Sequence, residues 1–235
     1  MNIVSVIPFA KNMSKEVLTY FTKQDVSIGD VVSIPLRKKT VRALVVSVSP
    51  LADSISAIRK TDFALRKITK VYGPAFIAPG FLGGATMLGE YISSGVGDIL
   101  NALLPKHFTA LSSIFSDYKI VIPVAKPNIK TEVLAFQAPL SDRLGFYKTF
   151  IREVFARKES ILFCFPTEHD IDVFRSSLEK GIVTYIYTLT GKLTEKQVVE
   201  TVRAIIENPH PVVIFTTPSY MFIPRSDIAT FVVEH

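Results

Sequence analysis

The hydrophobic pattern of the chain changes near residue 106, and this change constrains the fold more than any single motif does. Before it lie short β-branched runs with a near-alternating pattern, which predict strands. These runs are residues 3–9, 17–21, 31–36 and 41–49. The sequence Arg-Lys-Lys-Thr at 37–40 is typical of a hairpin connection. We therefore predict that residues 1–106 form a small, mostly β domain of barrel or sandwich type, closed by the apolar segment 76–104.

After residue 131 the pattern alternates between continuous apolar runs and amphipathic stretches. Strands are predicted at residues 133–139, 161–167, 183–189, 211–221 and 229–235. Helices are predicted at residues 144–158, 171–181 and 194–209, the last opened by Thr194 and closed by Asn208 and Pro209. This order is typical of a parallel α/β sheet that is covered on both faces. Residues 107–130 are expected to be a connector with one short strand at 119–125, and the fold class is α/β overall.

All of the net charge belongs to the first region. Residues 1–106 hold thirteen Lys and Arg against seven Asp and Glu, whereas residues 107–235 hold fourteen of each. The basic side chains gather in two groups, with aromatic residues nearby. They are Arg37, Lys38, Lys39 and Arg42, then Arg59, Lys60, Arg66, Lys67 and Lys70, and the rings are Tyr20, Phe21, Phe63 and Tyr72. A mixture of cations and rings is what binding to a polyphosphate with exposed bases requires.

Composition excludes several classes of protein. With 48% hydrophobic and 20% charged residues, the chain is expected to be globular. It has no apolar run of about 18 residues or more and no basic residue ahead of its first apolar run, so we expect no membrane span, no secretory signal and a cytoplasmic location. The single Cys164 is expected to be a buried apolar residue, and the four histidines lack metal-ligand spacing. Neither a metal nor a cofactor is expected.

Three separated blocks of the first region resemble one known domain. They are DVSIGDVVSIPLRKKTVRALVVSVSP at 25–50, LRKITKV at 65–71 and YISSGVGDILNALLP at 91–105. In this order they are similar to the amino-terminal DNA-binding domain of the primosomal protein N′ (PriA) family of replication-restart helicases. Residues 131–235 are similar to part of the first, RecA-like helicase lobe of that family. The resemblance implies a domain that captures the 3′ end of a nascent strand at a DNA fork, followed by a lobe that unwinds DNA with ATP.

The second region departs from the family at the phosphate loop. Where the family has a Gly-rich loop with Lys and Thr, the resemblance places Arg143 and Leu144, preceded by Pro139 and Asp142. A phosphate loop works because its glycines let backbone N–H groups approach the phosphates, while the Lys neutralises charge and the hydroxyl holds Mg²⁺. We therefore expect a degenerate nucleotide site, in which Arg143 is a solvated surface charge.

The second nucleotide motif is also altered. The resemblance places Val232 and Val233 at the Mg²⁺-binding Asp and the catalytic Glu of the family's Asp-Glu-Glu-His motif, and it leaves Glu234 and His235. The chain ends at His235, so the family's second helicase lobe and its zinc-binding cysteines are not expected here. The protein is therefore predicted not to be an enzyme.

The pocket that holds the 3′-terminal nucleotide in the family is altered as well. The resemblance places Thr19 at a family Asp, keeps Tyr20, and puts Arg37 at a Gly and Arg66 at a Lys. Thr19 loses the carboxylate but keeps one hydrogen-bonding hydroxyl, and Arg37 either fills part of the pocket or contacts the terminal phosphate. Tyr20 is either a base-stacking residue or a half-buried strand aromatic, and both interpretations stay open.

The preferred hypothesis is a non-enzymatic DNA-binding protein of replication restart, which binds branched or single-stranded DNA, or a 3′ end at a fork. The expected DNA-binding residues are Thr19, Tyr20, Arg37, Lys38, Lys39, Arg42, Arg66 and Lys67. Their cations would contact phosphates, which position the backbone without reading sequence; the alternative is that they only solubilise a hairpin. Two other hypotheses are an adaptor for another replication-restart protein and, more weakly supported, an ATP-dependent helicase or a fragment of one.

Overall fold

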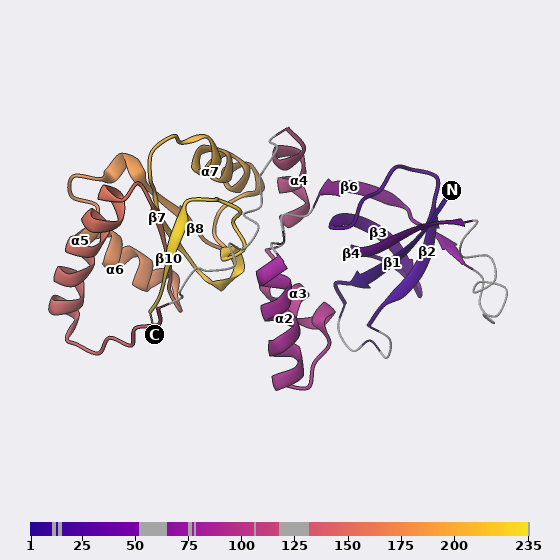
Figure 1. Cartoon of the computed structure of the whole chain (residues 1–235), viewed down its shortest axis with the longest axis horizontal. Helices are drawn as coiled ribbons and strands as arrows, with labels where there is room; N and C mark the ends of the chain where they lie inside the picture. The colour runs from indigo at the N-terminus through magenta and orange to yellow at the C-terminus, as the bar shows by residue number, and fades with distance from the viewer. Residues whose placement is uncertain are drawn as a thin grey trace. The chain divides into compact units, whose positions relative to one another are not determined.

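A computed structural model of the chain describes residues 1–10, 13, 16–51, 65–74, 77, 79–105, 107–117 and 132–234. The chain divides into two compact units, Met1–Lys119 and Ile120–His235, and each unit has its own sheet (Figure 1). None of the helices in the described part of the chain is both long enough and apolar enough to cross a membrane.

The first unit is built on a curled, six-stranded mixed sheet. Its strands are β1 (Asn2–Pro8), β2 (Leu18–Thr22), β3 (Asp30–Leu36), β4 (Lys39–Pro50), β5 (Arg66–Lys67) and β6 (Lys70–Pro74), in the order β5-β2-β1-β4-β3-β6. Only β2 and β5 pair in parallel. The link between β5 and β6 joins the two sides, because Ile68 N donates to Phe21 O at 3.0 Å and Thr69 N donates to Ser33 O at 2.8 Å. The sheet is therefore a half-barrel, and the predicted mostly-β first region is confirmed.

Apolar side chains at alternate positions along the strands fill the inside of this half-barrel. Successive side chains of a strand point to opposite faces, so every second residue is apolar and faces inward. The buried cluster consists of Val4, Val6, Tyr20, Val26, Val32, Ile34, Ala43, Val45 and Ile68. Ser5, Thr19, Ser33 and Arg42 lie between cluster members and so take the outer face.

Among the described residues, the first unit also contains the helices α2 (Pro79–Tyr91), α3 (Val96–Leu103) and α4 (Phe108–Asp117), and α4 corrects one predicted boundary. Helix α3 contacts β1, where a Cβ on Gly97 would lie 2.2 Å from Pro8 O, and α4 contacts β6. The prediction of a connector from residue 107 is wrong for α4, because Phe108, Leu111 and Ile114 share one helix face and are buried in the first unit. The predicted strand at 119–125 lies outside the described residues.

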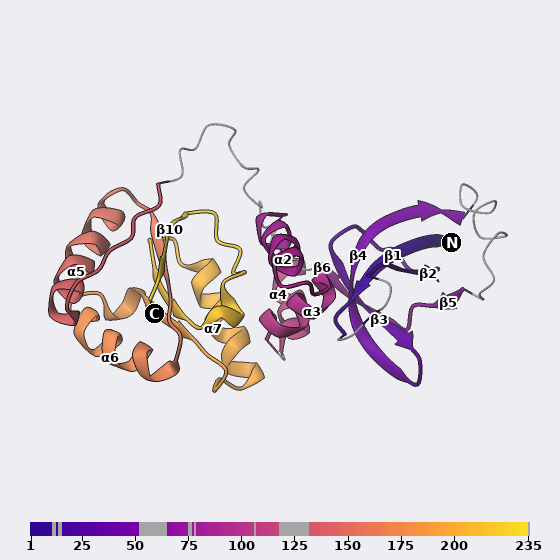
Figure 2. The same ribbon diagram turned by 90° about the horizontal axis from the view of Figure 1, so that it is seen from below.

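The second unit has a four-stranded parallel sheet, as its pattern predicts. The elements are α5 (Leu140–Ala156), β7 (Ser160–Cys164), α6 (Glu168–Leu178), η1 (Val183–Tyr185), β8 (Ile186–Leu189), α7 (Glu195–Glu207), β9 (Val213–Thr216), η2 (Pro218–Tyr220) and β10 (Ile228–Val233). The strand order is β10-β7-β9-β8, and every pair is parallel. Helices α5 and α6 lie on one face and α7 on the other (Figure 2). The prediction of a parallel sheet covered on both faces is confirmed.

The start and stop signals of α7 are also borne out, but one predicted strand is wrong. Thr194 forms a capping box with Gln197, and Asn208 is the C-cap. Residues 132–139 form no strand, and the side chain of Val133 is 90% exposed. An apolar run becomes a strand only where another strand pairs with it, and no pairing partner for this stretch is found among the described residues.

Candidate nucleic-acid interface

The β3–β4 hairpin carries three consecutive exposed cations at its tip. Arg37 and Lys38 form the two-residue connection, and Lys39 starts β4. The backbone of Arg37 has φ of 53°, which is the left-handed region that two-residue hairpins need and that usually selects Gly. A non-glycine residue there costs about 1 kcal/mol. The hairpin geometry thus favours Gly at position 37, the residue that the resemblance places there. Arg37 adopts the same positive φ at an energetic cost.

Tyr20 belongs to the core, which decides between its two interpretations. Its ring is 5% exposed, and its hydroxyl donates to Pro35 O at 2.9 Å. Burial raises the pKa of the Tyr20 phenol above its ordinary value, and the positive charge of Arg66 partly opposes this shift. Tyr20 is therefore not a surface for base stacking, and that part of the prediction is corrected. Its hydroxyl instead forms a hydrogen bond that connects β2 to β3, the first strand of the β3–β4 hairpin.

The β5 strand adds two further cations beside β2. Arg66 is in register with Tyr20 and Lys67 with Phe21, and both basic side chains are exposed. Tyr20 thus links the hairpin to β5, because its hydroxyl donates a hydrogen bond to Pro35 of β3 and the charge of Arg66 in β5 acts to lower its pKa, against the rise that burial causes. We name the exposed residues Arg37, Lys38, Lys39, Arg66 and Lys67 the basic rim.

Thr19 and Arg42 lie apart from the basic rim. Thr19 follows the inward-facing Leu18 and precedes Tyr20, so its side chain is on the outer face of β2, in register with Ser5. Arg42 is on the outer face of β4 and is half-buried. The structure therefore does not bring Thr19 and Tyr20 together in one pocket. The predicted cations Arg59 and Lys60, and the ring of Phe63, lie outside the described residues.

The residues that the sequence resemblance places at a degenerate nucleotide site contact one another in the second unit. Arg143, at the start of α5, forms an ion pair with Glu234, which follows β10, and the Tyr147 hydroxyl donates to the other carboxylate oxygen. Glu234 is buried, and the Arg143 side chain is only 24% exposed. The prediction that Arg143 is a solvated charge is therefore wrong. His235 lies outside the described residues.

The two charges pair with each other inside the protein, while the Nε of Arg143 is buried without a hydrogen-bond partner. Burial, the hydrogen bond to Glu234 and the negative charge of that carboxylate raise the pKa of Tyr147 far above its ordinary value, and Arg143 opposes them. The Arg143 guanidinium also lies 5.8 Å from the centroid of the Phe174 ring. A phosphate would have to displace Glu234 from Arg143, and the Glu234 oxygens already accept hydrogen bonds. Within the described residues no group of three or more His, Cys, Asp or Glu could hold a metal ion.

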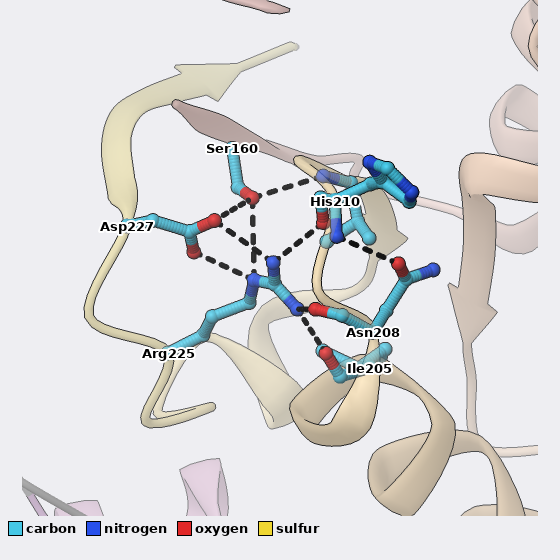
Figure 3. A network of polar contacts seen from close by, with 7 residues as sticks. Ser160, Ile205, Asn208, His210, Arg225 and Asp227 are labelled. Atoms are coloured by element: carbon cyan, nitrogen blue, oxygen red, sulfur yellow. Dashed lines mark hydrogen bonds and ion pairs between the residues drawn. The ribbon is translucent and has the colours of Figure 1, made fainter. Parts of the chain in front are cut away.

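A second polar network in this unit has no counterpart in the sequence prediction. Arg225 Nε donates to Asp227 Oδ1 at 2.6 Å and Nη2 donates to Oδ2 at 2.8 Å, which makes the pair bidentate. The Ser160 hydroxyl donates to Asp227 Oδ2 at 2.8 Å (Figure 3). Arg225 also donates to the carbonyls of Asn208 and His210, at 3.1 and 2.7 Å.

The position of this network indicates a structural role. Ser160 begins β7 and Asp227 precedes β10, so the network lies at the amino ends of the parallel strands. Ligands of open α/β sheets bind at the opposite, carboxyl ends. An Arg-x-Asp spacing is too common to signal such a network from the sequence. Arg225 therefore caps the end of α7 and fastens the start of two strands.

The described site residues thus fall into a basic rim on the first unit and an internally paired position on the second. No protein-family model matches the chain, and none of the curated proteins is significantly similar to it. The charges and contacts of these residues are therefore what indicates a function. The basic rim is the part of the described structure that offers several exposed charges of one sign to a ligand.

Proposed function

We propose that the protein binds single-stranded or branched DNA through the basic rim of its first unit. The observation that supports this most is the clustering of exposed cations, which the buried Tyr20 links across β2, β3 and β5. The first 106 residues also hold the whole net charge of +6. Phosphate contacts of this kind give affinity without sequence preference. The family resemblance further suggests a more specific ligand, the 3′ end of a strand at a replication fork.

The second unit then serves as a RecA-like scaffold without a working nucleotide site. The parallel sheet agrees with such a lobe. The ion pair between Arg143 and Glu234 takes the place where the resemblance puts the phosphate-binding Lys and the acidic motif. Under this proposal the protein is not an ATPase, acts in replication restart and is cytoplasmic.

The test is fluorescence anisotropy with a labelled DNA fork at several salt concentrations. For each single-strand phosphate contact, the logarithm of the binding constant should fall by about 0.7 per decade of salt. We expect Lys38→Glu with Lys39→Glu to weaken the binding of all DNA ligands. The matched control is Lys148→Glu with Lys180→Glu, which makes the same charge change at exposed lysines of the second unit. A flat salt response, or an equal loss in the control, refutes the proposal.

The same assay separates end capture from general binding. A fork with a free 3′-hydroxyl is compared with one that carries a 3′-phosphate. Preference for the hydroxyl would support recognition of the strand end, with Arg37 and Arg66 as the residues nearest to the altered family pocket. Equal binding would leave a general DNA-binding surface.

The adaptor hypothesis has one observation in its favour. Helix α2 exposes the large apolar side chains of Met87, Leu88 and Tyr91 at helical spacing, and Ile92, directly after the helix, is exposed as well. Apolar patches of this kind mark protein contacts. If the anisotropy assay finds no salt-sensitive DNA binding, this helix becomes the better starting point for assigning function.

A further inference from the structure

The first unit has a groove separate from the basic rim. Its volume is about 530 Å³, and it lies between the outer face of the sheet and helices α3 and α4. The sheet contributes Ser33, Arg42 and Tyr72 to its lining, while the helices contribute Asn101 and Phe108. The volume falls within the range of about 300 to 1,000 Å³ that is usual for sites that bind small molecules. The groove is thus large enough for a small molecule the size of one nucleotide and too small for a DNA duplex.

One side of the groove suits an anion. Arg42 is in register with Ser33 across β3 and β4, and Ser33 is in register with Lys70 across β3 and β6. Residues in register share a face of the sheet, so two basic side chains flank one hydroxyl. None of the described residues that line the groove is acidic. A phosphate would therefore find the positive charge of Arg42 and the hydroxyl of Ser33 in the lining, with the charge of Lys70 beside the groove.

Another part of the lining suits a nucleobase. The Tyr72 ring lines the groove, and the Lys70 ammonium lies 4.7 Å from its centroid. Aromatic rings stack on bases of any identity. Asn101 is exposed on α3 and offers an amide that both donates and accepts. Phe108 is buried and supplies an apolar surface.

We propose that this groove takes one unpaired nucleotide of bound DNA, with its phosphate near Arg42 and Lys70 and its base near Tyr72 and Asn101. This inference rests on the proposed DNA-binding function. Arg42 is three residues along β4 from Lys39 of the basic rim, which corresponds to about 10 Å, and the two side chains point to opposite faces of the strand. A DNA strand that passes around the hairpin edge can therefore contact the rim and enter the groove. The groove would make the protein prefer single-stranded over duplex DNA.

The test changes the shape of the groove without changing charge. Asn101→Trp places a bulky side chain in the groove, whereas Ala102→Trp places the same bulk on the neighbouring exposed position of α3, which does not line it. Fluorescence anisotropy is measured on the full chain with a labelled oligothymidylate and with a duplex of equal length. Loss of one base contact should weaken binding of the single strand about tenfold. We expect this for Asn101→Trp only, with duplex binding unchanged.

Each outcome decides the question. If Asn101→Trp binds the single strand as the wild type does, or if both Trp variants lose binding equally, the inference is overturned while DNA binding by the rim stands. If the wild type shows no salt-sensitive DNA binding, the proposed function fails and the inference fails with it. Tyr72→Leu is a second variant, in case Asn101→Trp unfolds the unit, and it should also reduce the preference for single strands.

Discussion

Removal of the Arg225 side chain should destabilise the second unit strongly. In Arg225→Met the aliphatic stem keeps its packing, but Asp227 loses its bidentate partner, and the carbonyls of Asn208 and His210 lose their donors. Breaking a buried ion pair by removing one partner costs about 3–5 kcal/mol. The Arg225 side chain is only 9% exposed, whereas Asp227 is 29% exposed, so water can partly replace the lost contacts. We therefore expect a loss at the low end of that range, about 3 kcal/mol.

Hydrogen exchange measured by mass spectrometry is the suitable assay. The chain has two units, so a single unfolding free energy of the whole protein is not well defined. Amides of β9, in contrast, report opening of the second unit itself. A loss of about 3 kcal/mol should speed exchange in residues 213–216 by roughly a hundredfold. Arg225→Lys keeps the charge but not the planar fork, so its effect should be intermediate.

The matched control is another paired arginine of the same unit. Arg175 forms an i,i+4 ion pair with Glu179 at 3.3 Å, but its side chain is 39% exposed. Exposed pairs of this type contribute less than about 1 kcal/mol, so Arg175→Met should leave β9 exchange nearly unchanged. If Arg225→Met lowers stability by no more than Arg175→Met does, the assignment of Arg225 as a structural clamp is wrong.

Two further predictions concern the strained hairpin and the buried phenol. Arg37→Gly should stabilise the first unit by about 1 kcal/mol in a hydrogen-exchange measurement, because it relieves the positive φ, and should reduce the salt slope of DNA binding by about 0.7; Lys38→Gly should lose the same contact without any gain in stability. Tyr147 has a raised pKa in the folded state, so its contribution to stability is fully present below the ordinary phenol value of 10.0 and falls as pH rises above that value. Tyr147→Phe should reduce the alkaline dependence in circular dichroism titrations without abolishing it, because burial also raises the pKa values of Tyr20 and Tyr220, and an unchanged dependence would contradict the role given to the Tyr147 hydrogen bond with Glu234.

Much of the fold could be predicted because the period of the hydrophobic pattern differs between the two regions. Alternation in residues 31–36 and 41–49, with a short basic link, is sufficient to predict the β3–β4 hairpin. The prediction of a strand at 133–139 depends instead on a continuous apolar run, and the strand is absent because such a run does not specify a pairing partner. Helix α4 was missed because its buried face contains only a few apolar positions and its sequence is short.

The site was less predictable because it depends on which face each side chain takes. Tyr20 and Phe21 are adjacent aromatic residues, and a shift of one position would exchange their places. The sheet register puts Tyr20 inside, so of its two interpretations the buried strand aromatic holds and base stacking does not. Arg143 and Glu234 are 91 residues apart, and only the parallel sheet brings the end of β10 to the start of α5. No spacing rule could have paired them.

The pairing of Arg143 with Glu234 also contributes to the stability of the second unit. A buried Glu234 without a cationic partner would cost several kcal/mol, and so would a largely buried Arg143 without an anionic one. The fold therefore tolerates the two charged residues when both are present, and loss of either one would leave the other buried without a partner. Tyr147 adds a hydrogen bond to the same carboxylate, so its burial depends on the pair as well. Side chains that fit one another across two distant segments stabilise the folded second unit, and under the proposed function that unit serves as a scaffold and does not bind a nucleotide.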